Sequence, residues 1–155
     1  MFDYQQLFHT GIRVPNLETA MAEIGAALGV TWAAPMHNPT QAVWTPADGQ
    51  QSLDLKFTYS AEGPQHIELL EGPAGSVWDG REAPGVHHQG VWVDDVTSEV
   101  ERCVALGWSC VASAAAPDEG YGTYAYLQPP SGMIVELVNS AAKPRFESWW
   151  AGGAL

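Results

Sequence analysis

The chain has 155 residues, 46% of them hydrophobic and 15% charged, and a formal net charge of −12. This length suits one compact domain, and the apolar content excludes a disordered chain. With six lysines and arginines against 18 acidic residues, nucleic acid and anionic membranes are unfavourable partners. No stretch approaches the roughly 20 apolar residues of a membrane helix, and no leader peptide is evident. Two cysteines make no disulfide framework, so we expect reduced thiols in a cytoplasmic protein.

The first half of the chain predicts a strand, a helix and three further strands. Residues 9–14 alternate in the manner of a half-buried strand. Asn16 is a typical helix N-cap, apolar residues recur at helical spacing over 17–28, and Gly29 is a typical C-terminal stop. Later strands are expected at 42–44, 53–58 and 66–70.

The second half repeats this order of signals. Residues 88–93 alternate like a strand, Asp95 is a typical N-cap, and a helix is expected over 96–106, before Gly107. Later strands are expected at 109–111, 124–127 and 134–138. Both halves therefore predict the order βαβββ.

A segment rich in glycine, proline and charge separates the halves, and an aromatic tail follows them. Exposing both Trp149 and Trp150 to water is unfavourable. We therefore expect the tail to dock on the chain's own surface or at a dimer interface, in preference to acting as a lid over a pocket. The expected organisation is one domain built from module 6–72, linker 73–84, module 85–140 and C-terminal tail 141–155.

An internal duplication is the most informative feature. Residues 9–17 and 88–96 share the pattern H-x-G-[IV]-x-V-x-[ND]-[LV]. Each copy closes with a short apolar strand that carries one acid, Glu68 in the first and Glu136 in the second. Matches at several positions in the same order make chance an unsatisfactory explanation. The fold class is therefore α+β, with two βαβββ modules forming a cupped mixed sheet.

Strand parity places two histidines and two acids on one face of this sheet. Residues two apart on a strand share a face, so His9 and His88 point away from the helices, as do Glu68 and Glu136. If the modules pair about a pseudo-twofold axis, these four side chains converge. Imidazole nitrogens with carboxylate oxygens suit one divalent ion such as Zn, Mn, Fe, Co or Ni. The alternative is a metal-free fold in which the four residues pair with one another.

The same parity argument selects further residues for the cup. Asp54 is expected to face it, although a place in a salt bridge at an exposed edge is an equal alternative. Arg13 would hold a substrate carboxylate or pair with an acid, and Trp92 faces the cup. The last two cup residues, Tyr124 and Tyr126, would donate to an oxyanion or fill the space. His87 is expected to point to the opposite face, and two further histidines, His37 and His66, to the surface.

The motifs that carry these residues resemble the vicinal oxygen chelate superfamily. The matching segments are Phe8-His9-Thr10-Gly11-Ile12, Ile67-Glu68-Leu69-Leu70, Val86-His87-His88-Gln89-Gly90 with Val93-Asp94-Asp95, and Pro129-Pro130-Ser131-Gly132 with Ile134-Val135-Glu136-Leu137. The resemblance covers about residues 6 to 140 and is closest to the epimerase- and lyase-like branch. It implies the metal ligands His9, His88 and Glu136, with Glu68 as a fourth or water-mediated ligand. It also implies a homodimer, and a proton-transferring acid on the strand of Asp54.

The expected function is that of a divalent-metal isomerase or epimerase, or a related lyase. The metal would act as a Lewis acid that stabilises an enolate, while Glu136, Glu68 or Asp54 shuttles the proton. Because the basic residues are few and scattered, a small, partly apolar, oxygenated substrate fits better than a CoA thioester. One alternative is a non-haem iron dioxygenase, against which a fourth protein ligand, Glu68, argues. The other is a metal-free drug-binding resistance protein.

Overall fold

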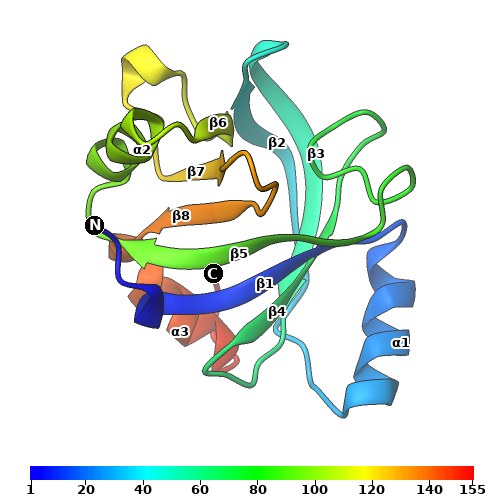
Figure 1. The fold of residues 1–155 in the computed structure, drawn as a ribbon. Coiled ribbons are helices and arrows are strands. Elements are labelled where there is room, and N and C mark those ends of the chain that lie inside the picture. The colour runs from blue at the N-terminus through cyan, green and yellow to red at the C-terminus, as the bar shows by residue number, and fades with distance from the viewer.

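Eight strands form a closed barrel in the computed structural model, which describes residues 1–155 (Figure 1). The order of strands around the barrel is β1-β4-β3-β2-β6-β7-β8-β5. The strands are β1 (Leu7–Arg13), β2 (Met36–Thr45), β3 (Gly49–Tyr59), β4 (His66–Glu71), β5 (Gly85–Val93), β6 (Ser109–Ser113), β7 (Tyr124–Gln128) and β8 (Val135–Asn139). The helices are α1 (Leu17–Leu28), α2 (Val96–Ala105) and α3 (Lys143–Trp150).

The two halves of the chain have the same topology, which confirms the predicted pair of βαβββ modules. In each half the first strand runs parallel to the fourth, β1 beside β4 and β5 beside β8. The halves meet where β1 and β5 pair in antiparallel fashion. On the far side, a bridge between Trp44 of β2 and Ser113 of β6 closes the barrel.

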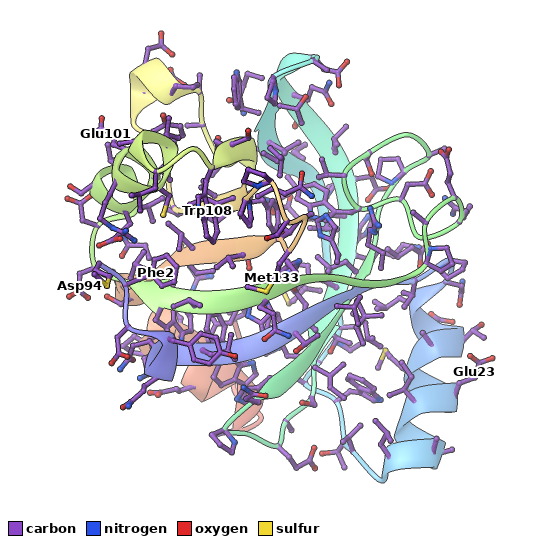
Figure 2. All side chains as sticks on the ribbon, in the orientation of Figure 1. Phe2, Glu23, Asp94, Glu101, Trp108 and Met133 are labelled. Atoms are coloured by element: carbon purple, nitrogen blue, oxygen red, sulfur yellow. The ribbon has the colours of Figure 1, made fainter.

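Helices α1 and α2 begin and end where the sequence predicts to within one residue. The side chain of Asn16 accepts a hydrogen bond from the Thr19 amide at 2.9 Å, and Gly29 has the left-handed φ of 70°. Asp95 caps α2 in the same way through the Ser98 amide. Both helices cover the outside of the barrel, α1 against β4 and α2 against β6, β7 and β8. Acidic side chains such as Glu23 on α1 and Glu101 on α2 project outward (Figure 2). None of the helices combines the length and apolar composition that crossing a membrane requires.

The inward face of β3 is opposite to the prediction. Leu55 and Tyr59 are buried inside the barrel, whereas the side chains of Asp54 and Lys56 are 59% and 45% exposed. The prediction assumed that the apolar face of every strand packs beneath a helix. Here α1 and α2 lie over other strands, so the outer face of β3 meets water and its apolar face turns into the barrel.

The aromatic tail docks on its own chain as helix α3. Trp149 is fully buried in an aromatic cluster, and its Nε1 donates a hydrogen bond to the Ala34 carbonyl at 3.0 Å. The ring of Trp150 stacks on His66 at 3.7 Å between centroids. His66 is therefore buried, contrary to the expectation of a surface residue, because the tail covers it.

Candidate metal centre and pocket

Four buried side chains converge where the two halves of the barrel meet, and they are His9, Glu68, His88 and Glu136. Strand register explains the convergence. Across β4, β1 and β5, Gly11 lies between Glu68 and His88. Across β1, β5 and β8, Gly90 lies between His9 and Glu136. Each row therefore holds one acid, one glycine and one histidine, and the duplication places the two rows side by side.

The glycine of each H-x-G motif makes room for the histidine of the other motif. A Cβ atom on Gly11 would overlap the ring of His88, and a Cβ atom on Gly90 would overlap the ring of His9. Neither glycine has a positive φ, so the reason for glycine here is space and not backbone conformation. The motif thus encodes a reciprocal contact between the two halves.

The four ligand atoms lie close enough together to share one ion, although the two histidine nitrogens are closer to each other than ligands of a bound metal would be. His9 Nε2 lies 2.8 Å from His88 Nε2, and the four distances from these nitrogens to Glu68 Oε2 and Glu136 Oε2 are 3.1–3.4 Å. Ligands at ~2.0–2.2 Å from a tetrahedral ion are about 3.3–3.6 Å apart. Glu68 Oε2 is buried, and its ion-pair partners are the two imidazole Nε2 atoms, which would become its fellow ligands around an ion. The donor set and its convergence therefore fit a divalent ion.

Electrostatic coupling within the cluster shifts the pKa values of its members. Burial lowers the pKa of His88, but the charge and hydrogen bonding of Glu136 outweigh burial and raise it to about 9. The pKa of His9 is raised in the same sense, against burial, by Glu68 and Glu136. Burial raises the pKa of Glu136, but the charge and hydrogen bonding of His88 and His9 together outweigh burial and lower it. Without a cation, the cluster therefore favours a protonated imidazole beside ionised carboxylates, and the 2.8 Å between the two Nε2 atoms allows one proton between them.

The cluster opens into a cavity of about 160 Å³ through its carboxylates. The side chains of His9 and His88 are fully buried, whereas those of Glu68 and Glu136 are 8% and 9% exposed and line the cavity. The remaining lining residues are mostly apolar or aromatic, and none is basic: Gln41, Leu55, Phe57, Tyr59, Leu70, Trp78, Thr123, Tyr124, Tyr126, Val138, Ala142 and Phe146.

Two of the predicted substrate-binding residues line this cavity. The hydroxyl of Tyr126 accepts a hydrogen bond from Trp78 Nε1 at 3.1 Å, which leaves its own proton available to a ligand. The hydroxyl of Tyr124 donates to the Ala42 carbonyl at 2.7 Å. Tyr126 can therefore act as a donor, whereas Tyr124 offers mainly its ring.

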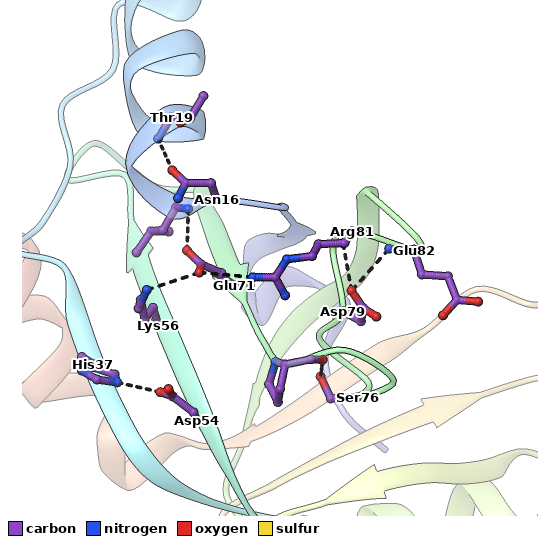
Figure 3. Close-up of polar contacts among 12 residues, drawn as sticks. Asn16, Thr19, His37, Asp54, Lys56, Glu71, Ser76, Asp79, Arg81 and Glu82 are labelled. Atoms are coloured by element: carbon purple, nitrogen blue, oxygen red, sulfur yellow. Dashed lines mark hydrogen bonds and ion pairs between the residues drawn. The ribbon is translucent and has the colours of Figure 1, made fainter.

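Asp54 does not face the cavity, contrary to the prediction. Its carboxylate lies outside the barrel, 2.6 Å from His37 Nε2, in a pair whose side chains are both more than half exposed (Figure 3). Lys56 on the same outer face pairs with Glu71. The physical reason is the inverted parity of β3, whose outer face has no helix over it. Asp54 is therefore too far from the cavity to act as its base.

Arg13 and Trp92 also do not line the cavity. The guanidinium of Arg13 bonds to the Val77 carbonyl at 3.4 Å, in the segment between β4 and β5. The ring of Trp92 stacks on Phe8 with 3.8 Å between centroids, as part of the aromatic cluster around α3. Both predictions relied on strand parity alone, which fixes the face of a residue but not its position along the barrel.

Sequence reasoning missed much of the cavity wall. The parity that turned Asp54 inward turned Phe57 outward, and Tyr59 lies beyond the strand expected over 53–58. Trp78 and Phe146 come from a loop and the tail, where no periodic pattern exists. Burial raises the pKa of Tyr59, and the nearby Glu68 raises it further, so the phenol stays protonated. Periodicity could have identified Tyr59 only if the position of the helices had been known.

A family model places the chain among known proteins. The model of the Glyoxalase/Bleomycin resistance protein/Dioxygenase superfamily matches residues 8–126, and the chain belongs to this superfamily. The predicted resemblance and fold are thereby confirmed. A comparison with curated proteins gave no match.

Solved structures of the same fold come from several proteins. A hypothetical protein from Bacillus halodurans C-125 is 20% identical, with 86% of this chain and 92% of that chain covered and a TM-score of 0.62. Methylmalonyl-CoA epimerase from Mycobacterium tuberculosis is 18% identical, with 94% and 97% covered and a TM-score of 0.58. A mutant of 4-hydroxymandelate synthase from Streptomyces coelicolor is 12% identical, with 86% and 48% covered and a TM-score of 0.57. At these identities the likeness extends to the fold, and the homodimer stays a prediction.

Proposed function

We propose that this protein is a divalent-metal-dependent isomerase or epimerase, or a closely related lyase, that forms an enolate from a small oxygenated substrate. One observation carries the proposal. The cluster of two histidines and two glutamates presents only its carboxylates, Glu68 and Glu136, to an aromatic cavity. A site built for binding alone has no need of two buried acids at its floor, since burying them is costly.

The chain's own residues supply the proton transfer. The ion held by the four ligands would contribute Lewis-acid stabilisation of negative charge on a substrate oxygen. Glu68 or Glu136 removes the proton next to a substrate carbonyl, and the electron pair of the broken C–H bond moves into the enolate. Return of the proton to the other face of the same carbon gives epimerisation, and return to a neighbouring atom gives isomerisation. Tyr126 can donate its hydroxyl proton to a substrate oxygen during this step.

The cavity wall favours an uncharged, partly apolar substrate over a CoA thioester. No basic side chain lines the cavity. Lys56 and Arg81 lie on the outside with Glu71 (Figure 3), and Arg102 pairs with Glu99 on α2. The phosphates of CoA would therefore meet a chain of net charge −12, and the basic residues nearest in sequence to the lining are Lys143 and Arg145 of α3, which do not line the cavity. An aromatic or aliphatic carbonyl compound with a second oxygen fits better.

Metal content and solvent proton exchange test the proposal. Protein purified without added metal should contain about one divalent ion per chain by elemental analysis. In heavy water it should catalyse deuterium uptake next to the carbonyl of members of a panel of small hydroxy- and oxo-compounds. Glu68→Gln and Glu136→Gln should each lower the exchange rate by at least about 100-fold. Asp54→Asn is the matched control and should change it less than about two-fold, since Asp54 lies outside the barrel.

Two other outcomes would replace this function. Oxygen consumption with ferrous iron would favour the dioxygenase alternative, which two histidines with a carboxylate and the dioxygenases named in the superfamily make the second candidate. Metal-free protein that binds an aromatic compound without changing it would favour the drug-binding alternative. Either result, without deuterium uptake, would contradict the enolate mechanism.

A further inference from the structure

His87 lies at a break in the strand pairing beside the metal centre. Along β1, Gly11 and Ile12 are consecutive, but their partners on β5 are His88 and Val86. His87 is therefore the extra residue of a β-bulge. A bulge re-aims the side chain that it carries, which explains why strand parity places this residue on the wrong face.

The re-aimed ring contacts the ring of His88. His87 Nδ1 lies 3.1 Å from His88 Nδ1, and the two rings meet edge to face at 5.2 Å. The ring of His87 also packs against Tyr126 on the cavity wall. His88 thus has both ring nitrogens in use, with Nε2 at the four-ligand cluster and Nδ1 at His87.

The contact allows one proton between the two Nδ1 atoms. Two nitrogens at this distance form a hydrogen bond only if one carries the proton and the other offers its lone pair. If His88 Nδ1 carries it, the Nε2 of a neutral ring is free to bind a cation. If His87 Nδ1 carries it, a neutral His88 must hold its own proton on Nε2, where it blocks the cluster. Metal binding therefore requires the first arrangement.

We propose that His87 is a positioning residue whose Nδ1 accepts the proton of His88 Nδ1 and thereby holds His88 in the tautomer and orientation that bind the metal. The inference rests on the metal centre of the proposed function. Ligand histidines are usually oriented by a carboxylate or a carbonyl. Here an imidazole from a bulge has that role. His9 has no such partner, since its Nδ1 is buried without a hydrogen bond, so the two ligand histidines are not equivalent.

Substitutions of His87 distinguish its role in orienting His88 from the packing of its ring against Tyr126. His87→Phe keeps a ring against Tyr126 but removes the acceptor, so the Nδ1 proton of metal-bound His88 is left buried and unpaired. In the metal-free protein this proton can move to Nε2, so the penalty falls on the metal-bound state. His87→Asn supplies an amide oxygen about where Nδ1 stands. His37→Phe, at an exposed histidine, is the control for the substitution itself.

Zinc affinity measured by competition with a chromophoric chelator is the readout, with folding checked by circular dichroism. His87→Phe should weaken zinc binding by about 10–100-fold, while His87→Asn should remain within a few-fold of the unaltered protein. Long-range proton–nitrogen spectra of zinc-loaded protein should show the His88 proton on Nδ1. Unchanged affinity in His87→Phe, or equal loss in His87→Asn, would overturn the inference and leave the proposed function standing. An unaltered protein that binds no zinc or other divalent ion would instead remove the proposed function itself.

Discussion

At the scale of single residues, two glycines decide whether the candidate site can form. Gly11 and Gly90 stand beside the histidines of the opposite half, and a single methyl group at either position would occupy the space of an imidazole. The cluster thus depends on the lack of a Cβ atom at these two positions as much as on its four ligands. Because both glycines have ordinary backbone angles, an alanine there should be tolerated by the strand and felt mainly by the histidine.

Gly90→Ala should therefore abolish tight metal binding while the barrel still folds. The added Cβ forces the ring of His9 away from its position, and a displaced ligand typically costs at least about 10-fold in affinity. Zinc titration with a competing chelator measures the loss. Thr10→Ala, on the same strand pair but of opposite parity, should bind zinc normally. Full affinity in Gly90→Ala would show that His9 is not a ligand.

Parity in the sequence was sufficient for the four cluster residues but not for Asp54. The period of two in β1, β4, β5 and β8 sets the facing of His9 and Glu68 correctly because the apolar side chains on the outer face of those strands pack in clusters with α1 or α2. On β3 the same rule gives the wrong face because no sequence signal says which strands the helices cover. A strand pattern defines two faces, and only packing says which of them is inside.

At the scale of elements, helix α3 both completes the core and forms part of the cavity wall. Trp149 fills the aromatic cluster and is fully buried, while Phe146 of the same helix lines the cavity. The tail is therefore a wall of the cavity that is anchored in the core. The sequence predicted that the tail docks, because two exposed tryptophans are unfavourable, but it gave no docking position.

Trp149→Ala should destabilise the protein by about 3–5 kcal/mol, since it empties a fully buried site and leaves the Ala34 carbonyl without its donor. For a domain of this size the melting temperature should fall by roughly 6–20 °C. Thermal unfolding followed by circular dichroism measures the shift. Ser148→Ala, the exposed neighbour, should melt like the unaltered protein. A melting temperature that stays unchanged in Trp149→Ala would mean that α3 is not anchored as described.

At the scale of the whole molecule, the buried cluster links stability to pH. In protein kept free of metal by a chelator, the pKa of His88 is about 9 against an ordinary 6.5, and that of His9 is also raised. A group whose pKa is raised by folding stabilises the folded state fully at any pH below its ordinary pKa. This contribution is lost as the pH rises through the pKa that the group has in the folded protein. The carboxylates have lowered pKa values, so their contribution is present above about 4.5 and is lost as pH falls below it.

Protein kept free of metal should therefore melt highest between about pH 4.5 and 6.5, and its melting temperature should fall from pH 6.5 to 9. Zinc should protect more strongly at the upper end of this range, because deprotonated imidazoles bind the cation. Scanning fluorimetry across pH, with zinc or with chelator, measures both trends. His37→Gln, at an exposed histidine, should follow the same curve. A melting temperature that does not change with pH between 6.5 and 9 would contradict the coupling within the cluster.

The sequence by itself determined the duplication, the order of elements, the helix caps and the four residues of the cluster. These follow from local rules: side chains alternate along strands, helices begin at capping side chains, and repeated motifs fold alike. The tertiary structure decided the rest. It set which face of β3 is inside, where α3 lies, that His87 leaves its expected face at a bulge, and that the cavity has no basic residue. Those features depend on which elements meet in space, and a pattern along one strand holds no information about its neighbours.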